Sequence, residues 1–142
     1  MITNAFLSYR HNNHIGIAAR ECLKPLCDDA GIRLVYDEVV TQQGDSLITF
    51  MEDLTAARCI FLLLSPDYFE SSYTLFELLC IAEREDFDAS LILPIRLTDQ
   101  VNTYAKTQAK EFWEANEDKR NELGRLLRNN NQLKNHSEDD HA

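Results

Sequence analysis

The strongest constraint on the fold is an alternation, along the chain, between short continuous apolar runs and longer segments with helical spacing. The apolar runs are short, rich in branched and aromatic residues, and not interrupted by alternating polar residues. This pattern is typical of strands that are covered on both faces in a parallel sheet. The runs that predict strands are NAFLSY (residues 4–9), IRLVYD (32–37), CIFLLLS (59–65) and SLILPI (90–95).

Between these runs, apolar residues recur at the three- and four-residue spacing of a helix face. Gly31 follows the first helical segment and is a residue type that commonly ends helices, while Pro25 predicts a kink or a restart within it. Ser71 or Ser72 is suited to cap the start of the third segment. The apolar positions of the second and third segments lie within residues 47–57 and 75–82. The expected apolar face of the first segment is made of Ile15, Ala18, Ala19, Cys22, Leu23, Leu26 and Cys27.

Strand and helix alternate with short connections, which predicts an α/β fold with right-handed crossovers. We expect a flavodoxin-like parallel sheet of four to five strands with helices on both faces. After Thr98 the chain becomes polar and helical, with Phe112 and Trp113 among its few apolar points and a break expected near Asn116. We therefore expect one domain over residues 1–130, followed by a polar tail, or the start of a linker to a further domain, over residues 131–142.

Composition narrows the classes of function. The chain has 24 acidic and 14 basic residues, a formal net charge of -10, which opposes binding to nucleic acid or to anionic membranes. It opens without a signal-peptide pattern, and no apolar run approaches the roughly 18 residues that cross a bilayer, so a cytoplasmic protein is expected. The cysteines lack metal-ligand spacing, which predicts buried reduced thiols and no metal site; they are Cys22, Cys27, Cys59 and Cys80.

Polar residues gather where the predicted strands end. The first strand ends in Ser8 and Tyr9, followed by Arg10, and the second strand ends in Asp37. Open α/β sheets bind ligands at the carboxyl ends of their strands, so these side chains are candidates for a binding site. The long loop that follows Asp37 carries Gly44 and is predicted to act as a mobile lid.

Glu77 stands within an otherwise apolar helical run, four residues after Tyr73. Residues four apart share a helix face, so an aromatic ring would lie beside a carboxylate, as suits a flat cationic ring next to a sugar. The spacing alone leaves a structural interpretation open. Glu77 would then only meet the positive end of the helix dipole, Tyr73 would only pack, and Asp37 would cap or pair with Arg10.

Several motifs, in order, resemble the Toll/interleukin-1 receptor (TIR) domain family, particularly its bacterial members. NAFLSYR resembles the first box of the family, LVYDEVVTQQGDSL the second strand and its functional loop, and MEDLTAARCIFLLLSPDYFESSY the helix and strand before the third helix. ILPI resembles the fourth strand, and Phe112 with Trp113 the third box. The resemblance extends from Asn4 to Ile95 and less clearly to Leu127, and it implies a flavodoxin-like fold.

The resemblance also implies two kinds of function. Some TIR domains act only as signalling adaptors through self-association, whereas others cleave NAD+ to nicotinamide and ADP-ribose or a cyclic isomer. In enzymatic members the catalytic glutamate lies in the third helix, four residues after an aromatic residue, usually Trp; Glu77 and Tyr73 match these positions. The substrate-binding positions that the resemblance implies are Tyr73, Tyr9, Arg10, Asp37, Gly44 and Ser8, with NAD+ as substrate and no other cofactor.

Cleavage of NAD+ at the ribose requires few catalytic groups. Nicotinamide leaves as a neutral molecule, so no general acid is needed, and a single carboxylate stabilises the oxocarbenium charge that develops on the ribose. A glycosidase needs two carboxylates because its leaving group is an alkoxide that has to be protonated.

We therefore expect an NAD+ glycohydrolase or ADP-ribosyl cyclase of a bacterial immune, anti-phage TIR protein that is activated by self-association. The expected partners are NAD+, other TIR domains and a further sensor domain. The alternative is a non-catalytic TIR adaptor or scaffold. A third hypothesis, a nucleoside deoxyribosyltransferase-like enzyme, fits the Ser-Tyr-Arg opening and the long second loop less well.

Overall fold

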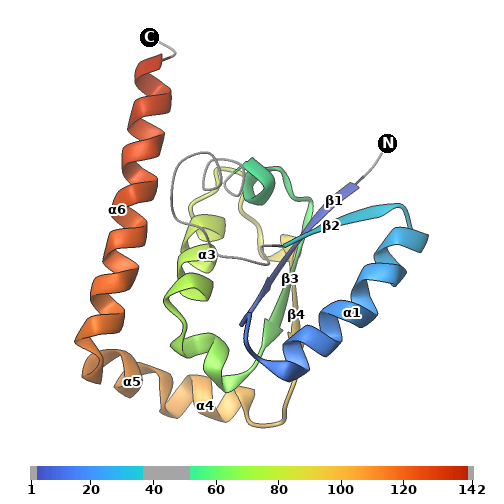
Figure 1. Ribbon diagram of the computed structural model, residues 1–142, viewed down its shortest axis with the longest axis horizontal. Coiled ribbons are helices and arrows are strands. Elements are labelled where there is room, and N and C mark those ends of the chain that lie inside the picture. Colours follow the sequence, from blue (N-terminus) through green and yellow to red (C-terminus); the bar gives the residue numbers. More distant parts are fainter. Residues whose placement is uncertain (1–2, 37–51, 141–142) are drawn as a thin grey trace.

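The chain forms a parallel sheet, shown in a computed structural model that describes residues 3–36 and 52–140, with side chains up to residue 131 (Figure 1). The strands are β1 (Thr3–Tyr9), β2 (Ile32–Val35), β3 (Cys59–Leu64) and β4 (Ile92–Arg96). All of them pair in parallel, in the order β2-β1-β3-β4. The predicted α/β, flavodoxin-like fold is confirmed, and the described residues form four strands.

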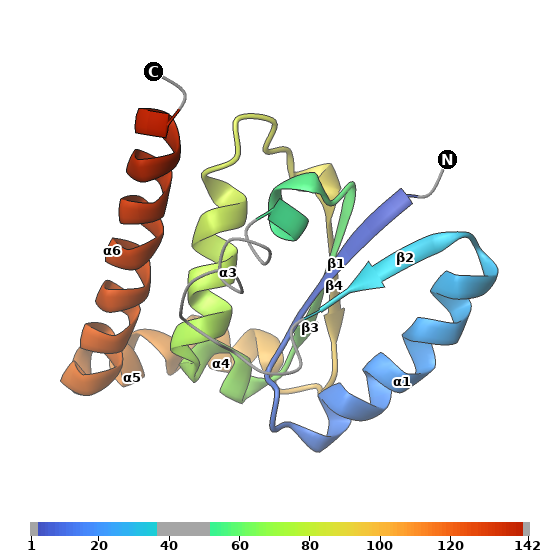
Figure 2. The same cartoon turned by 45° about the horizontal axis from the view of Figure 1, so that its top comes forward.

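Helices cover both faces of this sheet. Figures 1 and 2 show α1 (His14–Asp29) on one side of the strands and α3 (Ser72–Ala82) with α6 (Glu117–Asp140) on the other. Residues 52–56 are also helical, and they end the second predicted helix, whose earlier residues lie outside the described part. Short helices complete the chain: η1 (Pro66–Glu70), η2 (Ala89–Leu91), α4 (Val101–Thr107) and α5 (Ala109–Ala115).

The two-residue period of β1 divides its side chains between two cores. Ala5, Leu7 and Tyr9 pack on the α1 side, in a cluster with Cys27, Leu34 and Leu63. Phe6 points the other way, into a cluster with Phe76 and Ile81 of α3 and with Leu126 of α6. Ser8 has the parity of Phe6 and therefore faces α3, although its position in a buried strand would suit an apolar side chain.

Helix α1 has a capped start and ends before Gly31, as its sequence predicts. The Asn13 side chain accepts a hydrogen bond from Gly16 N at 2.8 Å, and Gly31, just past the helix, has a φ of 74°. The predicted restart at Pro25 is wrong, because the helix is continuous through this residue. Packing of Leu23 and Cys27 against the sheet on either side of Pro25 offsets the backbone hydrogen bond that proline cannot make.

The apolar face expected for α1 is partly wrong. Ile15 and Leu26 are exposed, by 51% and 65%, whereas Ile17 packs against the core. Cys22 is exposed as well, so the expectation of buried thiols holds for Cys27 and Cys80 only. All four cysteines are free.

Strand β4 lies at the edge of the sheet, and this position corrects a second expectation. Its apolar run predicted a strand covered on both faces, but Leu93 is 50% exposed. The edge position also explains Pro94, which has no N–H to donate to a neighbouring strand.

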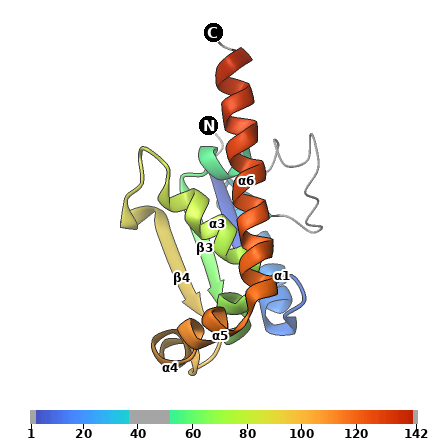
Figure 3. The same cartoon turned by 90° about the vertical axis from the view of Figure 1, so that its left-hand side faces the viewer.

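The chain after β4 passes along the carboxyl edge of the sheet through α4 and α5 and then returns along α3 as α6 (Figure 3). The helical segment breaks at Asn116, as expected. Two tertiary hydrogen bonds dock this segment: Trp113 Nε1 donates to the Phe69 carbonyl at 2.6 Å, and Ser72 Oγ donates to the Lys119 carbonyl at 3.2 Å. Residues 131–140, expected as a polar tail, continue α6.

Candidate functional site

The structure brings most of the predicted site residues to the carboxyl end of β1. Ser8 and Tyr9 are the last residues of β1, and Arg10 follows directly. Tyr73 and Glu77 lie one turn apart on α3, whose first turns meet this end of the strand. Asp37 and Gly44 lie outside the described residues.

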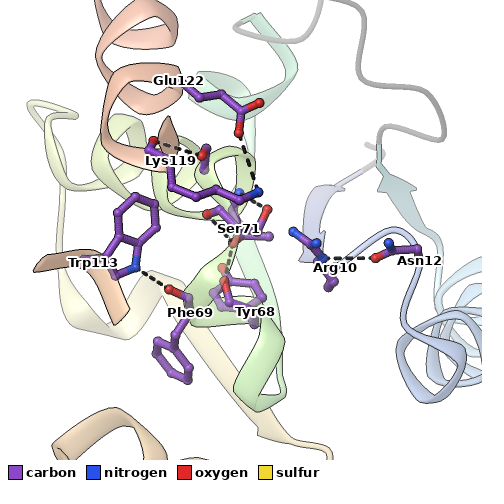
Figure 4. A network of polar contacts seen from close by, with 10 residues as sticks. Arg10, Asn12, Tyr68, Phe69, Ser71, Trp113, Lys119 and Glu122 are labelled. Carbon is purple, nitrogen blue, oxygen red and sulfur yellow. Dashed lines mark hydrogen bonds and ion pairs between the residues drawn. The ribbon is translucent and has the colours of Figure 1, made fainter. Parts of the chain in front are cut away.

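A cavity of about 310 Å³ opens between β1, α3 and α6. Arg10 bounds it on the β1 side, Ser71 at the start of α3, and Lys119 with Glu122 on α6 (Figure 4). Tyr73 lines it from the first turn of α3. Its remaining lining residues are Tyr9, His11, Asn12 and Thr74. Two of the predicted residues, Ser8 and Glu77, are not part of this lining. Ser8 directly precedes the lining residue Tyr9, and Glu77 lies one helix turn after the lining residue Tyr73.

Two cations face the cavity. Arg10 donates from Nε to Asn12 Oδ1 at 3.0 Å, and among the described side chains no carboxylate forms an ion pair with it. Lys119 Nζ lies 3.8 Å from Glu122 Oε1, a half-exposed pair that water and salt weaken. The cavity therefore offers positive charge from β1 and from α6, together with one acidic side chain.

Tyr9 borders the cavity, but its side chain lies on the α1 side of the sheet. The residue is 2% exposed, and its hydroxyl accepts a hydrogen bond from Arg20 of α1 at 2.7 Å. The same guanidinium lies 5.1 Å from the Tyr36 ring centroid. Arg20 thus fixes the Tyr9 ring in the core on the α1 side of the sheet.

His11 lines the cavity as a neutral side chain. Burial lowers its pKa, and the positive charges of Arg10 and Arg20 lower it further. The imidazole therefore adds no charge at neutral pH, and the positive potential of the cavity comes from Arg10 and Lys119.

Tyr73 lies between the cavity and the core. Its ring packs against the apolar cluster around Phe76, and it also lines the cavity. Burial raises its pKa, as does the negative charge of Glu122, while Arg125 acts in the opposite direction. The phenol therefore stays protonated at neutral pH.

Glu77 is buried, with 5% exposure, in the second turn of α3. The Ser8 hydroxyl donates to Glu77 Oε1 at 3.3 Å, and the Tyr68 hydroxyl lies 2.8 Å from Ser8 Oγ. A carboxylate is costly to bury without hydrogen bonds, so this pairing across the fold compensates part of the cost. Glu77 is therefore a buried carboxylate of the fold and not a surface residue of α3.

Three residues of this site had no signal in the sequence that marked them. Lys119 and Glu122 reach the cavity only because Trp113 and Ser72 dock α6 beside α3, through contacts more than forty residues apart. Tyr68 and Phe69 stand between two acidic residues in PDYFE, where an aromatic side chain could be assigned to the core alone. The only sequence cue for Tyr68 is proximity to Pro66 and Ser71, which predict a turn between β3 and α3.

Neither a metal site nor a membrane span is found in the described part of the chain. No three histidine, cysteine, aspartate or glutamate side chains within it are placed to hold a metal ion. None of its helices combines the length and the apolar character needed to cross a bilayer.

Comparison with known proteins identifies the family. The family model described as TIR domain matches residues 5–127, which covers the sheet, α3, the cavity and the first half of α6. No curated protein and no solved structure matches the chain significantly. The matched residues make up most of the chain and include the whole candidate site, so the chain belongs to the TIR domain family.

Proposed function

We propose that this TIR domain cleaves NAD+ between nicotinamide and ribose, as a glycohydrolase or ADP-ribosyl cyclase of a bacterial anti-phage response, and that self-association activates it. The observation that carries the proposal is the buried Glu77 carboxylate, hydrogen-bonded to Ser8 beside a cavity that presents an aromatic ring and two cations. A buried carboxylate next to a cavity is typical of a functional site.

Glu77 would act on the ribose. The bond between ribose C1′ and the pyridinium nitrogen breaks, its electron pair stays on nitrogen, and nicotinamide leaves as a neutral molecule. The positive charge that develops on C1′ is stabilised by the negative carboxylate in a site that excludes water. Water, or a base nitrogen of the substrate, then forms the new bond to C1′, and an attacking water passes its extra proton to the Glu77 carboxylate or to solvent.

The cavity beside Glu77 suits the rest of the dinucleotide. Arg10 and Lys119 face it from opposite walls and would hold the diphosphate, since guanidinium and ammonium groups bind phosphate oxygens well. Ser71 and Thr74, at the positive end of α3, also line the cavity. Tyr73 offers a ring on which the cationic nicotinamide would stack.

A specific observation favours the alternative of a non-catalytic scaffold. Glu77 is 5% exposed and does not line the cavity, so its carboxylate has no open path to a ligand among the described residues. In the catalytic account, association between copies has to open that path. In the scaffold account, Glu77 serves only to join α3 to β1.

The experiment compares nicotinamide release from NAD+ by the wild type and by Glu77→Ala over a wide range of protein concentration. Catalysis predicts release that rises more steeply than protein concentration and is abolished by the substitution. Glu85→Ala, at an exposed position just beyond α3, is the matched control and should behave as the wild type. Chromatography of the products separates hydrolysis from cyclisation, and circular dichroism checks the fold. Absence of release from the wild type, even in assemblies, would refute catalysis and favour the scaffold.

A further inference from the structure

The hydroxyls of Ser8 and Tyr68 form a continuous hydrogen-bond chain that ends at the Glu77 carboxylate. Ser8 Oγ lies 3.3 Å from Glu77 Oε1 and 2.8 Å from the Tyr68 hydroxyl. Ser8 and Tyr68 are both 0% exposed. Bulk water does not reach these hydroxyls, so each depends on the other members of the chain for its hydrogen bonds.

The direction of the chain follows from its proton count. Ser8 has one hydroxyl proton and donates it to Glu77, so the bond between Ser8 and Tyr68 has Tyr68 as its donor. Burial raises the pKa of Tyr68, and the negative charge of Glu77 raises it further. Tyr68 therefore remains a donor at physiological pH. It polarises the Ser8 hydroxyl and strengthens the bond that this hydroxyl donates to the carboxylate.

The same residue also fixes the helix that carries Glu77. The Tyr68 carbonyl accepts a hydrogen bond from Ser71 N at the start of α3 (Figure 4). It also accepts a hydrogen bond from the Thr74 hydroxyl in the first turn of this helix. Its ring packs edge-on against Phe69, with centroids 5.7 Å apart. The backbone of Tyr68 thus holds the first turn of α3 while its side chain holds Ser8, so the carboxylate and its donor are oriented by one residue.

We propose that Tyr68 and Ser8 are positioning residues for the Glu77 carboxylate, and that they keep it ionised and in a single orientation for the cleavage step. The inference rests on the proposed NAD+ cleavage, because it assigns Glu77 its role. Tyr68 touches no substrate and acts through Ser8. A merely structural network would stabilise the fold without affecting how Glu77 titrates.

The charged and titratable side chains that line the adjacent cavity are Arg10, His11, Lys119 and Glu122. Arg10 lies beyond the end of β1, and Glu122 and Arg125 of α6 lie beside Tyr73, one turn earlier on α3. None of them belongs to the hydroxyl chain. Substitution of Tyr68 by phenylalanine removes one hydroxyl and leaves these charges in place.

The test is Tyr68→Phe, measured with the full chain under the conditions in which the wild type is active. Without the Tyr68 hydroxyl, Ser8 donates more weakly to the Glu77 carboxylate, which disfavours its charged form, so the acid limb of the kcat profile should move to higher pH. We expect kcat to fall about tenfold while KM changes little. The matched control is Tyr104→Phe, which removes a hydroxyl that interacts with Glu70, the last residue of η1, and should change neither quantity.

A second variant distinguishes an effect through the hydroxyl chain from general damage to the fold. Ser8→Ala interrupts the same chain, so Ser8→Ala combined with Tyr68→Phe should lower kcat no more than Ser8→Ala alone, since both substitutions act through one path. Multiplying effects would show that Tyr68 acts independently of Ser8 and would overturn the inference.

A readout that needs no turnover separates this inference from the proposed function. The titration of Glu77 is followed by carbon NMR of carboxyl-labelled glutamate, with Glu77→Gln to assign the signal. A Glu77 pKa that is higher in Tyr68→Phe than in the wild type supports the positioning role, and an unchanged pKa overturns it whatever the activity. An inactive wild type would refute the proposed cleavage, and with it the catalytic purpose of the network, independently of the titration.

Discussion

The two halves of the candidate site are held in different ways. Ser8, Tyr68 and Glu77 are buried and joined by hydrogen bonds between β1, η1 and α3. The cavity beside them is partly open, and Arg10 and Lys119 on its walls are only half-buried. The difference separates two tasks. The group proposed to break the bond is fixed by the core, whereas the groups proposed to hold the substrate sit on adaptable side chains.

The largest expected effect is on the wall that α6 provides. Trp113→Ala removes the indole N–H that donates to the Phe69 carbonyl and leaves a space beneath α5. We expect the free energy of unfolding to fall by about 2–4 kcal/mol, measured by urea denaturation. NAD+ affinity should fall as well, because Lys119 depends on this docking. Unchanged affinity in a destabilised variant would show that α6 is not part of the binding site.

The buried half should be sensitive to the loss of single hydroxyls. Ser8→Ala leaves the Tyr68 hydroxyl buried without its acceptor, which should cost about 1–3 kcal/mol in the free energy of unfolding. Adding Tyr68→Phe should recover part of this loss, because the unpaired donor is then removed. Chemical denaturation of the two single variants and of the double variant measures both effects. A double variant less stable than either single variant would contradict the hydrogen-bond account.

Substitutions on the walls of the open cavity should weaken substrate binding and leave the cleavage step unchanged. Arg10→Ala and Lys119→Ala are each expected to raise the KM for NAD+ about tenfold while kcat stays close to that of the wild type, since each cation contributes to holding the diphosphate. Higher salt should reduce the difference. Lys106→Ala, at an exposed position in α4, serves as the control for the loss of one positive charge. A fall in kcat with unchanged KM would move these residues into the cleavage step.

The smallest effect is expected at the aromatic position. Tyr73→Trp enlarges the ring beside the cavity and should raise NAD+ affinity about twofold to fivefold, because tryptophan is the better partner for a cation. Calorimetric titration of both proteins measures the change. Weaker binding would indicate that the position is limited by packing against α6 and not by stacking.

The core of this fold was predictable from sequence because its strands are continuous apolar runs and its motifs follow in the order of the TIR family. Ser8, Tyr9, Arg10, Tyr73 and Glu77 were likewise predictable as neighbours, since the end of a strand and the start of the next helix meet at one edge of the sheet.

The rest depends on contacts that no local pattern encodes. The roles of Tyr68 and Lys119 follow from hydrogen bonds between elements more than forty residues apart in the chain. The exposure of Leu93 follows from the edge position of β4, which an apolar run does not reveal. The hydroxyl of Tyr9 turns to Arg20 because the two-residue period of β1 directs it to α1, away from Glu77.

The most direct test of the account measures binding and cleavage on the same Glu77→Gln protein. Calorimetry should give an NAD+ affinity within about threefold of the wild type, because the amide keeps the size of the side chain and the cavity walls are unchanged. Nicotinamide release should fall by about a thousandfold or more, because the negative charge that stabilises the ribose cation is gone. Release at the wild-type rate would contradict the central claim that the buried carboxylate breaks the bond.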